Sequence, residues 1–382
     1  MKFAHDFKET LSREGFPSHW VESAIPYSQL KKVLKRVAGE LNDLGLDPET
    51  LRQLLDPQSD SPLVIEYGLK GEAISTSASL ANPLCKQLEV PLVFDGKFFD
   101  MLQSDVNGLD ALQAREEVAM TKEIVALGQD VSQLTKPSRL SKSDLARWRT
   151  IFELYLEAQV FFSVYEQDHG TRDSHSASRQ LQWFQGEVTK RNLVRQFKMS
   201  ESREALVRFL RLNALLLKNI QFQEINRTAI HKILKKFDKR TSLGVSKTFP
   251  AQIRSDKLLA GTMARDMCAQ VSTELVSVVP QLNDYLCPVC FAIAYRPVRL
   301  ACQHIFCIRC IVKIQRRREK HCPLCRADVV MDASADNLDI ELDRYLRKYF
   351  NKEVKEKIRA NDIERGMEDY GPGYTHSDCA IM

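Results

Sequence analysis

The 382-residue sequence lacks the features of several protein classes. It contains no apolar run near 18 residues, the shortest length that suits a membrane-spanning helix. Its first residues, MKFAHDFKET, lack the apolar core of a secretory signal peptide. Charge is almost balanced, because 55 basic and 50 acidic residues leave a net charge of only +5, so there is no bulk nucleic-acid signature. We therefore expect a protein of the cytoplasm, the nucleus or both.

The sequence also has few cysteines for disulfide bonds. Ten are present, but seven of them lie between residues 287 and 325, which leaves Cys85, Cys268 and Cys379. This distribution favours a reducing compartment over a secreted disulfide protein. Apolar residues make up 44% of the chain, enough for a substantial core, and the length suits about two or three domains.

Residues 287–326 carry four pairs of metal-binding side chains. The pairs are Cys287/Cys290, Cys302/His304, Cys307/Cys310 and Cys322/Cys325. A two-residue gap lets a tight turn direct two sulfurs at one metal, and four N/S ligands suit tetrahedral zinc. Eight ligands predict two zinc ions, each without an open position for water, so the metal would be structural. A disulfide framework is the alternative, but pairs at this spacing favour zinc.

The order of these ligands resembles the RING finger. Three cysteines, one histidine and four cysteines follow each other, with a single residue between Cys302 and His304, whereas PHD-like and FYVE-like modules place the histidine or the gaps differently. The resemblance implies a small α+β cross-brace in which the first pair joins the third and the second joins the fourth. It also implies docking of a ubiquitin-conjugating enzyme and positioning of its ubiquitin thioester. The positions that the resemblance assigns to docking are Val289, Ile314, Pro323, Leu324 and Arg326. Many RING fingers carry tryptophan where this chain has Ile314, so less contact area is expected there.

Residues 225–241, INRTAIHKILKKFDKRT, predict a helix with two faces. Apolar residues recur at i, i+3, i+4 and i+7 from Ile230, and four lysines follow the same spacing shifted by two residues. That shift is about 200°, so the lysines lie opposite the apolar face. Like charges at these spacings repel, and a bound anion would relieve the repulsion. A solvated face or a glancing nucleic-acid contact are the alternatives.

Three segments together resemble the SPX domain: MKF at the start, YSQLKKVL at 27–34, and residues 225–241. The resemblance implies a helical hairpin packed on two long helices in a three-helix bundle. It also implies binding of inositol polyphosphates, especially pyrophosphates, in a basic basin. The basin residues that it assigns are Lys2, Tyr27, Lys31, Lys232, Lys235, Lys236 and Lys239. Lysine suits multiply phosphorylated rings as a flexible point charge. The irregular segment 56–92 departs from the family pattern.

The predicted fold class is mainly α. We expect the following segments: an SPX-like helical domain at 1–250 with an inserted loop at 56–92, a helical linker at 251–284, the RING at 285–330, a C-terminal helix at 331–366, and a flexible tail at 367–382. Within the first of these, helices are expected over 94–134 and 147–165. The C-terminal helix has an apolar face that suits packing against the RING or self-association as a homodimer, with membrane-surface binding as the alternative. The last four residues, from Cys379, match the C-a-a-X prenylation pattern, which predicts membrane association through a lipid.

These features together predict a RING-type ubiquitin-protein ligase linked to phosphate sensing. Its partners would be a ubiquitin-conjugating enzyme, ubiquitin, inositol phosphates, and protein substrates such as phosphate-pathway proteins or transporters. A non-catalytic phosphate-sensing scaffold, in which the RING only folds or dimerises, is the main alternative. Nucleic-acid binding rests on the lysines alone.

Overall fold

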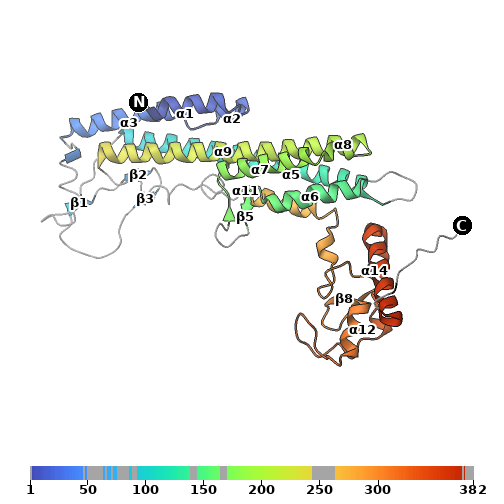
Figure 1. The fold of residues 1–382 in the computed structure, drawn as a ribbon. Helices are drawn as coiled ribbons and strands as arrows, with labels where there is room; N and C mark the ends of the chain where they lie inside the picture. The colour runs from blue at the N-terminus through green and yellow to red at the C-terminus, as the bar shows by residue number, and fades with distance from the viewer. Residues whose placement is uncertain are drawn as a thin grey trace. The chain divides into compact units, whose positions relative to one another are not determined.

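The computed structural model describes residues 2–45, 48–49, 93–137, 144–163, 170–242, 263–371 and 374, together with short strands between residues 63 and 87. It is mostly α-helical, as predicted (Figure 1). The chain forms two compact units. The first unit comprises Met1–Leu127, Ala158–Glu187 and Leu206–Ser272, and the second comprises Gly128–Glu157, Val188–Ala205 and Thr273–Met382. No helix in the described residues is both long and apolar enough to cross a membrane.

The first unit begins with a helical hairpin. Helix α1 (Lys2–Arg13) and the short α2 (Ser18–Glu22) lead into α3 (Tyr27–Asp43). Gly15 lies between α1 and α2 with φ +65°, a left-handed conformation that glycine adopts without steric cost. The rings of Phe3 and Tyr27 meet edge to face with centroids 4.9 Å apart, which joins the first turns of α1 and α3.

Two long antiparallel helices complete the bundle of the first unit. They are α5 (Val93–Thr135) and α9 (Ser200–Thr241). The start of α5 lies beside the end of α9, where the centroids of the Phe98 and Phe237 rings are 5.0 Å apart. Further along, Gln223 Nε2 donates to Gln113 Oε1 over 3.0 Å. Apolar side chains of α1, α3, α5 and α9 share one buried core. The predicted hairpin and three-helix bundle are therefore present.

The aromatic segment predicted as a helix over 147–165 ends earlier. Helix α6 spans Leu145–Ala158, and Gln159 then adopts a φ of +45°, which terminates the helix. The aromatic residues that follow form strand β5 (Phe162–Ser163), which pairs antiparallel with β6 (Gly170–Thr171). The remaining elements that the structure describes in this half of the chain are α7 (Ser174–Lys190), α8 (Leu193–Gln196) and strands β1 (Leu63–Val64), β2 (Tyr67–Leu69), β3 (Glu72–Ile74) and β4 (Lys86–Gln87). Strands β1 and β4 are parallel, and β2 and β3 are antiparallel.

The predicted linker is helical over part of its length, and residues 251–262 of it lie outside the described residues. Helix α11 (Met263–Gln270) continues as a six-residue π-helix, η2 (Val271–Val276), and a 3₁₀ turn, η3 (Leu282–Tyr285), follows. Gly128 of α5 lies against the π-helix so closely that a Cβ atom there would overlap the Glu274 carbonyl oxygen. The second unit therefore needs a glycine at this contact.

The zinc-finger segment folds around a two-stranded antiparallel sheet and one helix. Strands β7 (Pro297–Arg299) and β8 (Ile305–Cys307) pair Val298 with Phe306, and α12 (Ile308–Arg316) follows directly. Its core is small and contains cysteine side chains beside aliphatic ones. A 3₁₀ turn, η4 (Ala335–Asn337), leads out of it.

The C-terminal helix predicted over 331–366 is two helices, α13 (Ile340–Tyr349) and α14 (Asn351–Tyr370). They break at Phe350, whose φ of −125° and ψ of 42° are not helical and whose ring is fully buried. The apolar face of these helices packs against Ile293 and neighbouring aromatic residues of the zinc-finger segment. Of the roles predicted for this apolar face, the structure shows packing against the zinc-finger segment. Of the predicted tail, α14 takes residues up to Tyr370, and Cys379 lies outside the described residues.

Arg149 of α6 connects this helix to the C-terminal helices within the second unit. Its side chain is 9% exposed, and its Nε donates to the Pro280 carbonyl over 3.0 Å. One terminal nitrogen donates to Glu353 Oε1 and the other to the Tyr349 carbonyl, both over 3.2 Å. We call these contacts, with the stacking of Arg149 on Phe350, the Arg149 clasp.

Candidate metal centres and basic surface

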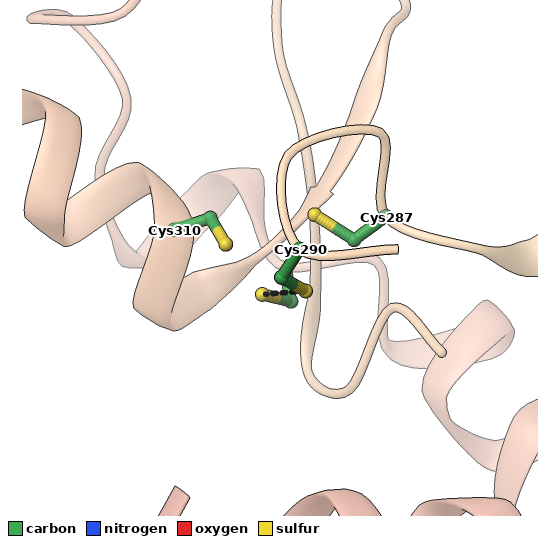
Figure 2. Close-up of side chains that lie close together, drawn as sticks. Cys287, Cys290 and Cys310 are labelled. Carbon is green, nitrogen blue, oxygen red and sulfur yellow. Dashed lines mark hydrogen bonds between the residues drawn. The ribbon is translucent and has the colours of Figure 1, made fainter. Parts of the chain in front are cut away.

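Four cysteines far apart in the sequence meet in the first cluster. Cys287, Cys290, Cys307 and Cys310 place their sulfur atoms within 4.8 Å of one another, and those of Cys290 and Cys307 are 3.8 Å apart. Figure 2 shows three of these side chains with their sulfurs turned toward a common centre. Thiolates bound tetrahedrally to zinc at about 2.3 Å lie roughly 3.8 Å apart, so this cluster fits a zinc ion.

The second cluster contains Cys302, His304, Cys322 and Cys325, again with ligand atoms within 4.8 Å of one another. The Nδ1 atom of His304 lies 3.3 Å from the Cys302 sulfur and 3.6 Å from the Cys322 sulfur, so Nδ1 is the nitrogen that would coordinate a metal here. The first pair joins the third and the second joins the fourth. The cross-brace implied by the RING resemblance is therefore present, and the two clusters fit two zinc ions.

One cysteine pair in each cluster, Cys287/Cys290 and Cys322/Cys325, is shaped by the same kind of backbone turn. Cys287 N donates to the Ala292 carbonyl over 2.8 Å, and Phe291 N donates to the Cys287 carbonyl over 2.8 Å. In the last pair, Cys322 N donates to Ala327 over 2.8 Å and Arg326 N donates to Cys322 over 2.9 Å. Phe291 and Arg326, each next to the second cysteine, have φ values of 53° and 61°. Each turn presents two sulfurs on one side, which suits a metal.

The donor chemistry of the first cluster also suits a divalent cation. Hydrogen bonds from Cys287, Cys307 and Cys310 lower the pKa of Cys290, and the contacts of Cys310 with the same group of thiols raise the pKa of Cys310. The four thiols therefore cannot all ionise together without a cation between them. Cys268 contrasts with them, because burial raises its pKa to about 12 and makes it an unreactive thiol.

The structure exposes most of the residues that the RING resemblance assigns to docking. Val289 is 39% exposed and Leu324 is 55% exposed, and Pro323 and Arg326 are also exposed. Ile314 differs, because it is 6% exposed and packs in the core of the zinc-finger segment. Sequence reasoning missed Phe291, which is 79% exposed on the turn of the first pair. Its position in the sequence directly after the ligand Cys290 was the signal that could have indicated its place on this turn.

Basic side chains gather where α3 meets the end of α9 in the first unit. Burial, followed by the charges of Lys31 and Arg240, lowers the pKa of Lys236, which places these three cations near one another. Lys232 Nζ lies 5.9 Å from the centroid of the Phe3 ring of α1. Tyr27 is 6% exposed, and burial raises the pKa of its hydroxyl, so that this group stays a hydrogen-bond donor.

Three of the predicted basin residues remain: Lys235, Lys239 and Lys2. Lys235 and Lys239 are exposed on α9, four residues apart, and the side chain of Lys2 lies outside the description. Arg240 was missed by sequence reasoning, although it follows Lys236 by four residues and so shares its helix face. We call Lys31, Lys232, Lys236 and Arg240 the basic surface.

Comparison with known proteins places this architecture among recognised families. The SPX domain model matches residues 1–84 and 70–253, and the model of the C3HC4-type RING zinc finger matches residues 287–325. The two SPX matches overlap within the segment predicted as an insertion. No solved structure matches the chain.

Two relatives match over nearly their whole length. One is the transcriptional regulator of yeast form adherence 3 of Candida albicans, 30% identical over 100% of both chains. Another is an uncharacterized RING finger protein of Schizosaccharomyces pombe, 31% identical over 95% of this chain and 96% of that protein. The human E3 ubiquitin-protein ligase RNF138 is 37% identical, but over only 23% of this chain and 34% of its own. The chain therefore belongs to the SPX domain family and carries a C3HC4-type RING finger after that domain.

Proposed function

We propose that this protein is a RING-type ubiquitin-protein ligase. The observation that carries the proposal is the pair of interleaved metal clusters, whose matching turns hold Val289 and Leu324 in exposed positions. Zinc would fix these turns and take no other part. A ubiquitin-conjugating enzyme would dock on the two turns, and Arg326, exposed directly after the last ligand, would contact its bound ubiquitin. The partial similarity to E3 ligases such as RNF138 supports the same activity.

The rate enhancement in this proposal comes from positioning. Holding a ubiquitin thioester in one reactive orientation lowers the entropic part of the barrier, and no side chain of the protein needs to form a covalent bond. Because Ile314 is buried, docking would depend more on Val289 and Leu324 than on the helix position. This dependence makes the two exposed residues the best targets for mutation.

A ubiquitin-discharge assay with the full chain tests the activity. The chain is mixed with conjugating enzymes loaded with ubiquitin, and release of ubiquitin to free lysine is followed. We expect acceleration with at least one enzyme, reduced about tenfold or more by Val289→Ala or Arg326→Ala. Met331→Ala, at a residue that is 45% exposed and outside both turns, is the control. No acceleration with any enzyme of a broad panel would favour the non-catalytic scaffold.

We also propose that the basic surface binds an inositol polyphosphate or pyrophosphate, as the SPX family implies. The support is the mutual repulsion of Lys31, Lys236 and Arg240, which a multiply charged anion would offset. The buried Tyr27 hydroxyl would add a directed hydrogen bond. Through this ligand the protein would report cellular phosphate, with phosphate-pathway proteins or transporters as the substrate class.

Calorimetric titration of the full chain with an inositol pyrophosphate at fixed salt tests the binding site. Lys232→Ala/Lys236→Ala should weaken binding at least tenfold, whereas Lys122→Ala, at an exposed position of α5, should not. Equal binding by the double variant would refute the site assignment. A steep salt dependence with DNA, together with indifference to inositol phosphates, would instead favour nucleic-acid binding.

A further inference from the structure

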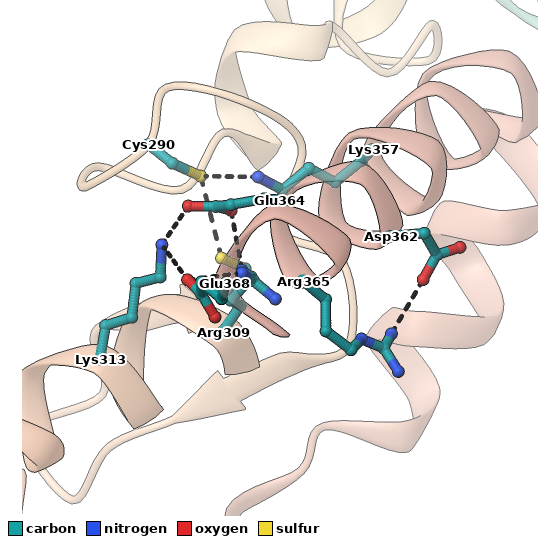
Figure 3. Close-up of polar contacts among 9 residues, drawn as sticks. Cys290, Arg309, Lys313, Lys357, Asp362, Glu364, Arg365 and Glu368 are labelled. Carbon is teal, nitrogen blue, oxygen red and sulfur yellow. Dashed lines mark hydrogen bonds and ion pairs between the residues drawn. The ribbon is translucent and has the colours of Figure 1, made fainter. Parts of the chain in front are cut away.

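Lys357 contacts a metal ligand from outside the RING motif. It lies on α14, and its Nζ atom is 3.4 Å from the Cys290 sulfur (Figure 3). The two residues are 67 positions apart in the chain. Neither the docking of a conjugating enzyme nor the binding of an anion uses this contact.

Ion pairs hold α14 in position beside the first cluster. Arg309 of α12 contacts Glu364 over 2.8 Å and Glu368 over 2.9 Å. Lys313 also pairs with both carboxylates, and Figure 3 shows the four side chains converging between the two helices. Lys357, Glu364 and Glu368 are seven and four residues apart, so they share one face of α14. The ion pairs thus direct Lys357 toward Cys290.

Helix α12, which supplies the basic partners of these ion pairs, carries two metal ligands itself. Cys307 is the N-cap residue of α12, and Cys310 lies in its first turn. Helix α14 therefore meets the first cluster at two places, through the Cys290 turn and through α12. Arg309 is 17% exposed, so part of this contact is shielded from water and from salt.

The two clusters differ in the charge that they would carry with zinc. Four thiolates and one Zn²⁺ leave two negative charges, whereas three thiolates, a neutral histidine and Zn²⁺ leave one. A cation that hydrogen-bonds a ligand sulfur offsets part of that charge, and outer partners of this kind stabilise bound metal. Lys357 contacts the cluster with the larger negative charge.

We propose that Lys357 is an outer-sphere residue of the four-cysteine metal site. Its ammonium group hydrogen-bonds the Cys290 sulfur and selectively stabilises the metal held by Cys287, Cys290, Cys307 and Cys310. Helix α14 is then part of this metal site, although it lies outside residues 287–325 that match the RING model. The inference rests on the proposal that zinc occupies the clusters.

The test follows the loss of metal from each cluster separately. The full chain is exposed to a chelator and an alkylating reagent, and mass spectrometry follows modification of the first-cluster and second-cluster cysteines over time. Lys357→Met keeps most of the length of the side chain and removes its charge. We expect it to accelerate modification of the first cluster about tenfold, the lower end of the effect of removing an outer partner, and to leave the second cluster unchanged. Lys357→Arg should restore most of the protection.

The control is Lys355→Met, which removes an exposed lysine from the same helix. Equal rates for Lys357→Met and Lys355→Met, or equal acceleration of both clusters, would overturn the role of Lys357. The zinc content of the wild-type chain is measured separately. Two zinc ions per chain with no selective effect would overturn this inference alone, whereas a chain without zinc would overturn the metal assignment itself.

Discussion

The guanidinium of Arg149 stacks on the ring of Phe350, with its central carbon 4.1 Å from the ring centroid. The same planar group donates hydrogen bonds to Pro280, Tyr349 and Glu353. A guanidinium suits this place because it can stack on a ring and donate in several fixed directions at once. The Arg149 clasp thereby holds the break between α13 and α14.

Replacing Arg149 by methionine should destabilise the second unit. The Pro280 and Tyr349 carbonyls would lose their donor, and Glu353 would lose its partner. We expect the free energy of unfolding to fall by about 2–4 kcal/mol, measured by chemical denaturation and by amide hydrogen exchange in α14. Arg149→Lys should recover less than half of the loss, because one ammonium group cannot donate in the several fixed directions in which the planar guanidinium donates. Arg344→Met, at an exposed position of α13, is the control, and equal stability of the two methionine variants would contradict the prediction.

Two glycines of α5 should respond oppositely to alanine. At Gly108 a Cβ atom meets no heavy atom within 4 Å, so Gly108→Ala should stabilise the helix by about 0.5–1 kcal/mol. At Gly128 a Cβ atom would overlap the Glu274 carbonyl, so Gly128→Ala must displace the π-helix and should cost about 1–3 kcal/mol. Thermal unfolding of the two variants measures both signs. A stabilising Gly128→Ala would show that the linker does not pack on α5.

The carboxylate of Asp105 should make the first unit less stable as the pH rises. Among the described side chains, its Oδ2 is buried without a hydrogen-bond partner, and burial raises its pKa to about 6. The folded state therefore holds a proton that the unfolded state releases near pH 4, so stability falls between about pH 4 and pH 6.

The variant Asp105→Asn removes this titration. At pH 7 we expect it to exceed the wild type by about 1–2 kcal/mol, a value reduced for partial exposure of the group. The difference should vanish below about pH 4, where Asp105 is protonated in both the folded and the unfolded state. Denaturation curves of both proteins across this range give the comparison, and Asp100→Asn, at an exposed site of α5, is the control. A constant difference at every pH would rule out the titration of Asp105.

Removal of zinc should unfold the RING and leave the helical core of the first unit intact. The zinc-finger core is small, and four of its buried members are the ligands Cys287, Cys307, Cys310 and Cys322. Such cores depend on metal for their stability. After chelation, most of the helical circular dichroism should remain, while all seven ligand cysteines become open to alkylation. Retained protection of these cysteines would show that the segment folds without metal.

Local patterns predicted the parts of the protein that local chemistry determines. The gaps between ligands placed Cys287 and Cys290 on one turn, and the repeat of apolar residues placed Phe237 in the core of the bundle. Lys357 and Arg149 escaped prediction because their partners are 67 and 200 residues away, and no spacing along a helix encodes such a contact. The break at Phe350 was missed for the same reason, since its cause is burial against distant elements.

The position of the Arg149 clasp in the chain also imposes an order on its assembly. Glu353 follows Arg149 by 204 residues, so at about 5–20 residues per second roughly 10–40 s of translation separate the two. Until then the guanidinium lacks its Glu353 partner, and the Phe350 ring on which it stacks is made only shortly before. A chain that ended before Phe350 would leave Arg149 of α6 without the Phe350 and Glu353 contacts, an exposed and unsatisfied surface of the kind that chaperones and proteases recognise.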